Sequence, residues 1–347
     1  MRLRNDLLFS ILLPILLPLT SSTQLPLVIW HGLGDTFTNP SLLSLTTLAA
    51  NTNPNTSTYL IHLSPSSATD RTSTFLGHLP TQLSTICTTL STDPSLSGGF
   101  NALGLSQGGQ FLRGLIETCP TLPRVGTLIT LGSQHSGISR FVKRCDLTDW
   151  VCELTVKALN TAKWGRWAQR NVVPAQYFRD PRDSESFLRY SGWLADVNNE
   201  RPGDGEDGRE REEGRKYKER LVGRLGRLVM LMWRDDETVV PKESAWFADV
   251  YEDDDEEEGD DGEGKRRVVW LNQTQGYKDD WIGMRTLDEE GRLEFLEVEG
   301  GHMEIGEELA RELMWVYFGP DGKRGEWKWS PPKEDERRVE EVGWELR

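Results

Sequence analysis

Short runs of continuously apolar residues recur along this chain of 347 residues. The runs cover residues 25–30, 99–105, 125–131 and 228–233. A strand that is buried on both faces is apolar throughout, because helices cover both sides of its sheet. Between the first two runs, residues 76–90 carry leucines and an isoleucine every three or four positions, which is helical spacing. Strands that alternate with helices in this way predict an α/β fold with a mostly parallel central sheet flanked by helices.

The first 22 residues have the layout of a cleaved secretory signal peptide. Arg2 and Arg4 precede an apolar run at residues 7–19, and small polar residues follow it. A membrane-spanning helix would need about 20 apolar residues, whereas this run has 13 and contains Pro14 and Pro18. We therefore expect a mature chain without a stable membrane span that enters the secretory pathway.

Entry into that pathway affects how the four cysteines behave. Cys87, Cys119, Cys145 and Cys152 would mature in an oxidising lumen, where three pairings are possible. Cys145 and Cys152 are close enough to close a local loop, which would leave Cys87 with Cys119. We expect no zinc site, because neither a CxxC pair nor a histidine cluster accompanies the cysteines.

Two further features concern the surface. Asn55 and Asn272 begin N-x-S/T sequons, which agree with N-glycosylation in the same compartment. Residues 252–263 hold ten acidic groups and no basic one, and so supply much of the net charge of −15. Such a block predicts a solvated, disordered loop at about 252–264. An acidic surface also argues against nucleic-acid binding, which requires a basic face.

We expect the chain to divide into a signal peptide (1–22), a main α/β domain (23–319) and a peripheral charged tail (320–347). The strand signal lapses between residues 137 and 224. This stretch holds two of the cysteines, a tryptophan-rich helix-like part around Trp164 and Trp167, and a charged, glycine-rich loop at 199–215. We interpret it as an insertion between two core strands.

Ser106 is the candidate nucleophile. It lies in a G-x-S-x-G motif at residues 104–108, between an apolar strand and a helix start. In a nucleophile elbow the chain turns sharply from strand to helix and exposes the serine hydroxyl, so glycine is needed on both sides. The alternative is a tight glycine turn without chemistry. The flanking strand and helix favour the elbow.

A serine hydroxyl needs a base to take its proton. In α/β-hydrolases the order along the chain is serine, acid, histidine. Of the histidines after Ser106, only His302 leaves room for a strand and an acid before it, whereas His135 does not. Asp236 is the candidate acid, because it begins a D-x-x-V-x-P turn after the strand at 228–233, and Asp235 is the alternative. The acid would hold the imidazole in one tautomer.

Two backbone N–H groups should face the oxyanion of the tetrahedral intermediate. One belongs to Gln107, the residue after the nucleophile. The other should come from the loop after the first strand, where the sequence His-Gly-Leu-Gly-Asp at 31–35 makes Leu33 the expected donor. We interpret His31 as structural. Neither a cofactor nor a metal is needed for this chemistry.

With these motifs assembled, the chain resembles the palmitoyl-protein thioesterase family over residues 25–318. The matching motifs stand in the same order at 27–35, 101–110, 131–137, 194–200, 244–247 and 299–302. The resemblance implies a lysosomal enzyme that removes long-chain fatty-acyl groups, chiefly palmitate, from S-acylated cysteines of proteins. The expected signal peptide agrees equally with a vacuolar or a secreted protein. It also implies that the insertion shapes an acyl groove, and it fits the pairing of Cys87 with Cys119 and of Cys145 with Cys152.

Two departures from the family concern loops. The adjacent cysteine pair that the family has after the HG loop is absent, and Phe37 and Thr38 stand there instead. The acidic run after Tyr251 and the tail after Gly319 are extra. The alternative functions are a lipase or carboxylester hydrolase and an acyl-coenzyme A thioesterase, all with the same triad, and a lipid-binding protein that has lost turnover.

Overall fold

The computed structural model describes residues 24–141, 145, 148–201, 212–252 and 266–319. Its centre is a six-stranded sheet in the order β10-β6-β4-β3-β1-β2, and every neighbouring pair is parallel. The strands are β1 (Leu27–Trp30), β2 (Thr58–Leu60), β3 (Phe100–Leu105), β4 (Val125–Leu131), β6 (Leu225–Trp233) and β10 (Leu293–Val298). The predicted α/β fold is confirmed.

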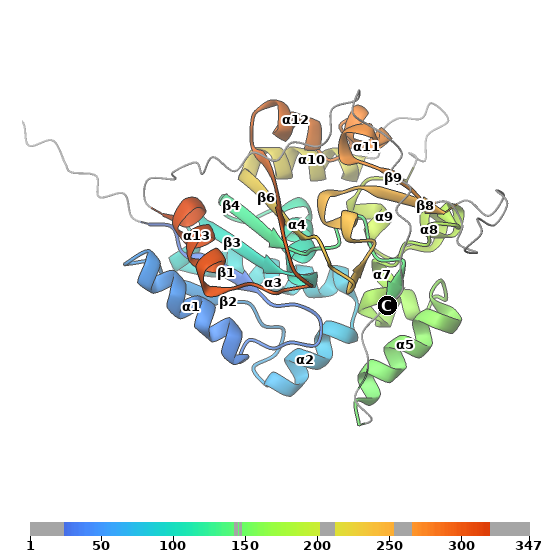
Figure 1. The fold of residues 1–347 in the computed structure, drawn as a ribbon, viewed down its shortest axis with the longest axis horizontal. Helices are drawn as coiled ribbons and strands as arrows, with labels where there is room; N and C mark the ends of the chain where they lie inside the picture. Colours follow the sequence, from blue (N-terminus) through green and yellow to red (C-terminus); the bar gives the residue numbers. More distant parts are fainter. Residues whose placement is uncertain (1–23, 142–144, 146–147, 202–211, 253–265, 320–347) are drawn as a thin grey trace, which may run out of the picture.

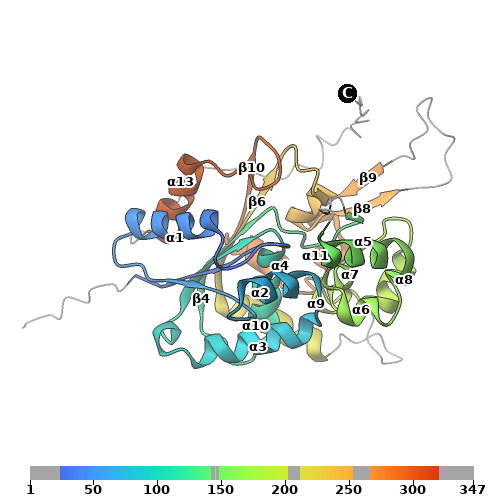
Figure 2. The ribbon, with the colours of Figure 1, turned by 90° about the horizontal axis from the view of Figure 1, so that it is seen from below.

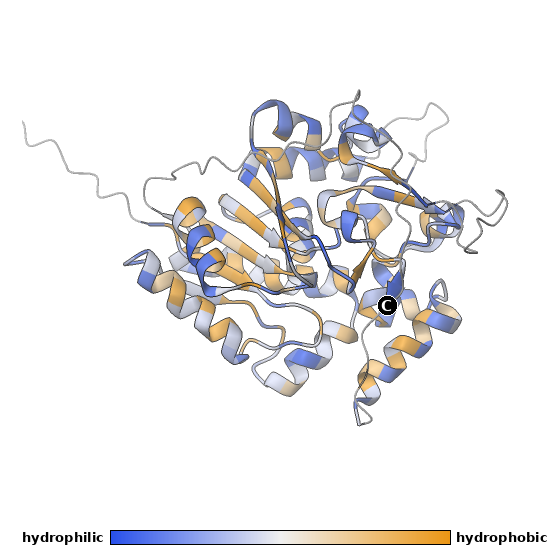
Figure 3. Ribbon diagram, in the orientation of Figure 1, coloured by the Kyte–Doolittle hydropathy of each residue, from blue (hydrophilic) through white to orange (hydrophobic). Residues whose placement is uncertain are grey.

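Helices cover both faces of this sheet (Figures 1 and 2). One face carries α1 (Pro40–Thr52) and α13 (Glu307–Phe318), which pack against each other. The other face carries α3 (Leu79–Thr92), α4 (Gln107–Thr118) and α10 (Glu212–Arg224). Because side chains alternate along a strand, Val28 packs in the core under α3 and α4, whereas Ile29 packs in the core under α1 and α13. Both faces of the strand are therefore apolar, and Figure 3 colours the central strands largely as hydrophobic.

The region after β4 departs from the regular alternation. It contains α5 (Trp150–Ala162), α6 (Ala168–Asn171), α7 (Val173–Gln176), α8 (Ser184–Tyr190) and α9 (Leu194–Val197), which gather beside one end of the sheet (Figure 2). The tryptophan-rich part is not one helix, since α5 ends at Ala162 and Trp164 lies in the turn before α6. The N–H of Gly165 bonds the carbonyl of Ala162 at 2.8 Å and closes this turn.

The charged segment expected as a loop at 199–215 is helical from Glu212, where α10 begins and packs against α4. Strand β6 starts at Leu225, three residues before the apolar run at 228–233. The remaining elements are α2 (Ser67–Phe75), α11 (Gln275–Lys278), α12 (Met284–Glu289), the antiparallel pair β5 (Arg140–Phe141) with β7 (Val239–Val240), the antiparallel pair β8 (Asp249–Glu252) with β9 (Arg266–Val269), and 3-10 turns at Pro94–Leu96, Lys242–Trp246 and Leu271–Gln273.

Three expectations fall outside the described residues. These are the signal peptide at 1–22, nearly all of the acidic loop at 252–264, and the tail at 320–347. Among the helices that the structure describes, none has the length and apolarity that crossing a bilayer requires.

Candidate active site

Ser106 stands at the turn between β3 and α4, at the carboxyl edge of the sheet. Its backbone has φ 50° and ψ −119°, a conformation that costs energy for a residue with a side chain. The N–H of Ser106 donates to the carbonyl of Leu131 at the end of β4, at 2.7 Å. The hydroxyl is thus aimed by a strained backbone that the neighbouring strand holds in place.

Glycine is required at both flanking positions of the motif for steric reasons. A Cβ on Gly104 would lie 2.2 Å from the Cα of Gly109, and a Cβ on Gly108 would lie 2.3 Å from the carbonyl oxygen of Trp30. No real Cβ tolerates such contacts, so β1, β3 and α4 can meet at the elbow only with glycine at both positions. The spacing read from the sequence as G-x-S-x-G therefore describes a three-way contact of backbones.

His302 reaches Ser106 from the loop after β10. Its Nε2 lies 3.0 Å from the Oγ of Ser106, and its Nδ1 lies 2.6 Å from the Oδ2 of Asp236. The imidazole rests against the end of β4, where Gly132 has φ +55° and an added Cβ would lie 3.0 Å from the Cε1 of His302. The structure thus brings the three residues together in one series of hydrogen bonds, with the imidazole in the middle.

Asp236, and not Asp235, is the acid that contacts His302. The Oδ1 of Asp236 accepts from the N–H groups of Thr238 and Val239, both at 2.9 Å, which leaves Oδ2 for the imidazole. Its side chain is almost fully buried. The carboxylate of Asp235 instead accepts from the N–H of Gly300 at 3.3 Å. The turn after β6 therefore fixes one carboxylate oxygen and presents the other to the imidazole of His302.

The two expected oxyanion donors lie near this series. Gln107 is the first residue of α4, where a backbone N–H has no acceptor within the helix. The loop after β1 passes directly beside the nucleophile, since a Cβ on Gly32 would lie 3.2 Å from the Cβ of Ser106. Leu33 follows in that loop. Both segments thus border the place where an attacked carbonyl would sit.

His31 is buried beneath the same loop. Its Nε2 lies 2.9 Å from the Oδ2 of Asp70, and its Nδ1 lies 3.1 Å from the carbonyl of Gly32. Burial would raise the pKa of Asp70, but the hydrogen bonds from His31 and from two backbone N–H groups outweigh it, so the pKa lies below its ordinary value. Sequence reasoning missed Asp70, which no motif marks.

His135 lies elsewhere in the core. It is fully buried, its Nε2 lies 3.1 Å from the Oγ1 of Thr130, and its ring stacks on Phe247 with centroids 4.5 Å apart. Burial, with a smaller contribution from Arg113, holds its pKa well below the ordinary value. His135 is therefore a neutral core residue that does not contact Ser106.

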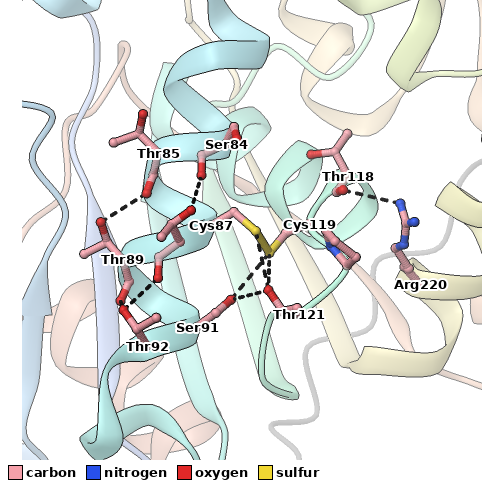
Figure 4. The surroundings of a disulfide bond; sticks show 12 residues. Ser84, Thr85, Cys87, Thr89, Ser91, Thr92, Thr118, Cys119, Thr121 and Arg220 are labelled. Carbon is pink, nitrogen blue, oxygen red and sulfur yellow. Dashed lines mark hydrogen bonds between the residues drawn. A yellow bond between two sulfur atoms is a disulfide. The ribbon is translucent and has the colours of Figure 1, made fainter.

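The structure pairs Cys87 with Cys119 and Cys145 with Cys152. Figure 4 shows the first pair joining α3 to the end of α4, beside the hydroxyls of Ser91 and Thr121. Both sequon asparagines lie in described parts of the chain. Asn55 is exposed, and Asn272 is half-buried. Within the described ranges, His, Cys, Asp and Glu form no group of three that could hold a metal ion.

In α/β-hydrolases the nucleophile sits on the turn after a central strand, and the acid and histidine reach it from loops after later strands. The present chain has this arrangement and is an α/β-hydrolase by fold. The family model described as palmitoyl protein thioesterase matches residues 26–302. The chain belongs to the palmitoyl protein thioesterase family.

Curated relatives agree with this membership. The chain is 32% identical over 300 residues to "Palmitoyl-protein thioesterase 1" of Caenorhabditis elegans, which covers 86% of this chain and 93% of the relative. It is 34% identical over 296 residues to "Palmitoyl-protein thioesterase-dolichyl pyrophosphate phosphatase fusion 1" of Schizosaccharomyces pombe, with 82% of this chain and 42% of that longer relative covered.

Similarity to solved structures is more remote. RedJ-thioesterase from Streptomyces coelicolor aligns over 84% of this chain and 89% of its own, at 12% identity and a TM-score of 0.39. The monoacylglycerol lipase of Paleococcus ferrophilus aligns over 84% of this chain and 94% of its own, at 14% identity and a TM-score of 0.40. Similarities of this size do not bear on the activity.

Proposed function

We propose that this protein hydrolyses long-chain fatty-acyl thioesters and removes palmitate from S-acylated cysteines of proteins, with Ser106 as nucleophile, His302 as base and Asp236 as its orienting acid. The single observation that carries the proposal is the hydrogen-bond series at 3.0 and 2.6 Å through the imidazole, in a chain of this family. The substrate class comes from the names of the relatives.

In the first half of the proposed cycle, Nε2 of His302 takes the hydroxyl proton while Oγ of Ser106 attacks the thioester carbonyl carbon. The N–H groups of Leu33 and Gln107 stabilise the oxyanion. The carbon–sulfur bond then breaks, and the imidazolium gives its proton to the departing cysteine sulfur. Asp236 stabilises the imidazolium through Nδ1 in this interval.

In the second half, water attacks the acyl-serine and His302 takes a proton from it. The second tetrahedral intermediate collapses, the fatty acid leaves, and Oγ of Ser106 regains its proton. A long acyl chain is favoured because each methylene that becomes buried contributes about 0.8 kcal/mol. The inserted region after β4 is the part of the chain that we propose to supply this burial, as an acyl groove.

The proposed setting is the lumen of the secretory pathway, in a lysosome, a vacuole or outside the cell. Both disulfides agree with an oxidising compartment. Relatives include "Lysosomal thioesterase PPT2-B" of Xenopus laevis, at 28% identity. The expected signal peptide and the sequons at Asn55 and Asn272 belong to the same proposal.

The test compares the hydrolysis of a palmitoyl-cysteine peptide with that of the matching palmitoyl-serine peptide and of palmitoyl-coenzyme A. We expect the highest kcat/KM for the cysteine thioester, and a loss of at least about 10³-fold in kcat for Ser106→Ala. Preference for the oxygen ester would indicate a lipase or esterase instead. Preference for the coenzyme A thioester would indicate the acyl-coenzyme A thioesterase alternative. Absence of turnover, with no labelling of Ser106 by a fluorophosphonate, would indicate a binding protein.

A further inference from the structure

The side chain of Gln107 is held at both ends of its amide. Its Nε2 donates to the carbonyl of Thr74 at 3.2 Å, and its Oε1 accepts from the hydroxyl of Tyr177 at 2.7 Å. Gln107 and Tyr177 are each 1% exposed, and Thr74 is buried as well. The residue whose backbone N–H is the proposed oxyanion donor therefore has a fixed and fully buried side-chain amide.

Thr74 also holds the other oxyanion segment. Its Oγ1 accepts from the N–H of Gly34 at 2.8 Å, and the same hydroxyl donates to the carbonyl of Arg71 at 2.7 Å. Gly34 directly follows Leu33, the second proposed donor. Thr74 at the end of α2 therefore contacts both segments, the loop after β1 through its hydroxyl and the elbow through its carbonyl.

Tyr177 comes from the inserted region and is fixed there. Its carbonyl accepts from the N–H of Ile138 at 3.1 Å, and its ring packs edge-on against Phe111 of α4 with centroids 6.3 Å apart. Burial raises the pKa of its phenol far above the ordinary value, so the hydroxyl stays protonated and remains a donor. The inserted region thus contributes one fixed hydrogen bond to the elbow.

The separation of two oxyanion donors decides whether both reach one oxygen atom, since each must lie about 2.7–3.1 Å from it. Leu33 and Gln107 belong to segments far apart in the sequence, and the elbow between β3 and α4 is strained. A contact that joins the two segments would keep both donors in place during the reaction. Such a contact would not itself touch the reacting acyl carbon.

We propose that Thr74, Gln107 (through its side chain) and Tyr177 are positioning residues that hold the two oxyanion donors at a fixed separation. The inserted region then influences the rate of the chemical step through Tyr177, apart from any contact with the acyl chain. This inference rests on the proposed function, because it assigns the N–H groups of Leu33 and Gln107 to the oxyanion.

The first experiment replaces Tyr177 by Phe, which keeps the ring and removes the donor. Removing a whole oxyanion donor costs about 10²–10³-fold in kcat, so displacing one should cost about tenfold, with KM changed less than about twofold. Tyr217→Phe is the matched control. Tyr217 is also buried, and its hydroxyl donates to Asp196 at 3.2 Å. Asp196 belongs neither to the loop after β1 nor to the elbow between β3 and α4. The control should keep kcat within about twofold.

A second measurement separates positioning from a merely structural role. A palmityl trifluoromethyl ketone forms a tetrahedral adduct with the serine and requires the oxyanion donors, whereas palmitamide binds without forming one. Tyr177→Phe should weaken the ketone by the same factor as kcat and leave palmitamide unchanged. Equal weakening of both ligands would overturn the proposal, because it would indicate a general distortion of the site.

Thr74 gives an independent pair of variants if Tyr177→Phe does not fold. Thr74→Val removes the acceptor for Gly34, whereas Thr74→Ser keeps it. We expect Val to lower kcat by about tenfold and Ser to restore most of it. Equal activity of the Val variant and the unaltered protein would overturn the proposal.

The rate of Ser106 labelling by a long-chain fluorophosphonate distinguishes this proposal from the proposed function. The phosphoryl oxygen uses the same donors whatever the natural substrate is, so Tyr177→Phe and Thr74→Val should slow labelling even if no palmitoyl thioester is hydrolysed. If both variants were labelled at the rate of the unaltered protein and hydrolysed the thioester normally, the positioning role would be refuted. The thioesterase proposal would then stay intact.

Discussion

The sheet and the first part of the inserted region, residues 137–201, are held together in different ways. In the sheet, the backbone groups pair in ladders, and residues such as Val28 and Leu128 are fully buried among other apolar side chains. In the inserted region, α6, α7 and α9 have four residues each, too few for a helix to pair its own terminal groups.

In the inserted region, the side-chain amides of buried glutamines bond backbone groups of this kind. Gln169 donates to the carbonyls of Lys163 and Ala175, both at 2.7 Å, and accepts from the N–H of Gly192 at 2.6 Å. Gln176 joins the region to the start of α3 by accepting from the N–H of Leu79 at 2.9 Å. Apolar packing and backbone ladders therefore hold the sheet, whereas the inserted region, which also buries apolar side chains, depends in addition on particular side-chain hydrogen bonds.

The largest expected effect concerns Asp236, which lies in the turn after strand β6 of the sheet. Asp236→Asn keeps the size of the side chain but favours the wrong imidazole tautomer, so kcat should fall by about 10³–10⁴-fold. Steady-state kinetics on a palmitoyl thioester measures it. Asp235→Asn is the matched control and should change kcat little. A larger loss for Asp235→Asn would mean that the neighbouring carboxylate orients the base.

The next effect concerns the junction of the two regions. Arg113 of α4 is fully buried, donates to Glu117 at 3.0 and 3.1 Å and to the Oδ1 of Asn198 at 2.8 Å, and stacks over Phe247. Arg113→Met leaves Glu117 without its partner and should lower the free energy of unfolding by about 3–5 kcal/mol, measured by urea denaturation.

The double variant Arg113→Met/Glu117→Leu sharpens that result. Because both charges are then removed, it should regain much of the lost free energy of unfolding. If the double variant were no more stable than the single one, the loss would come from packing and from Asn198, and not from the unpaired carboxylate.

Gln169→Leu tests the comparison directly. It nearly conserves volume but leaves the carbonyl of Lys163 and the N–H of Gly192 without their partner, whereas the carbonyl of Ala175 still accepts from the N–H of Phe178. It should lower the free energy of unfolding by about 3 kcal/mol. Leu231→Met, a volume-conserving change at a fully buried position of β6, should cost less than about 1.5 kcal/mol. Equal costs in thermal or urea unfolding would remove the distinction between the two regions.

The smallest effect is a dependence on pH at the same junction. Burial raises the pKa of Glu117 to about 7, although Arg113 lowers it in part. The folded protein therefore keeps a proton that the unfolded chain releases above its ordinary pKa of about 4.5. Stability from this group is complete below that value and is lost as the pH rises toward 7.

Glu117→Gln isolates this contribution, because other titrating groups such as His135 are common to both proteins. The free energy of unfolding of the unaltered protein, minus that of the variant, should decrease by about 2–3 kcal/mol between pH 4.5 and pH 7. A difference that stays constant over this range would mean that Glu117 keeps an ordinary pKa in the folded protein.

The same contrast explains what could be predicted from the sequence. Four strands of the sheet are marked in the sequence by continuous apolarity, and β10 by an alternation of apolar and acidic residues. In contrast, β2, at the edge, has three residues and only half-buried side chains. The grouping of Ser106, Asp236 and His302 follows from the order of elements along the chain, since parallel strands end at one edge.

The contacts that surround this grouping could not be predicted. Thr74 and Tyr177 reach Gln107 from 33 and 70 residues away, through one hydrogen bond each, and no periodicity or motif marks such a contact. The same holds for Asp70 beneath the loop after β1. The short helices of the inserted region depend on such contacts, so their positions in the chain could not be predicted either.

The left-handed glycine at the end of β4 has a consequence for how this enzyme class can vary. A Cβ on residue 132 would lie 3.0 Å from the Cε1 of His302 and 3.2 Å from the ring of Trp233, and the left-handed backbone here disfavours any side chain. We therefore expect a saturation survey of the chain to find few tolerated substitutions at residue 132. The absence of a side chain at residue 132 thus helps to keep the imidazole of His302 where it is.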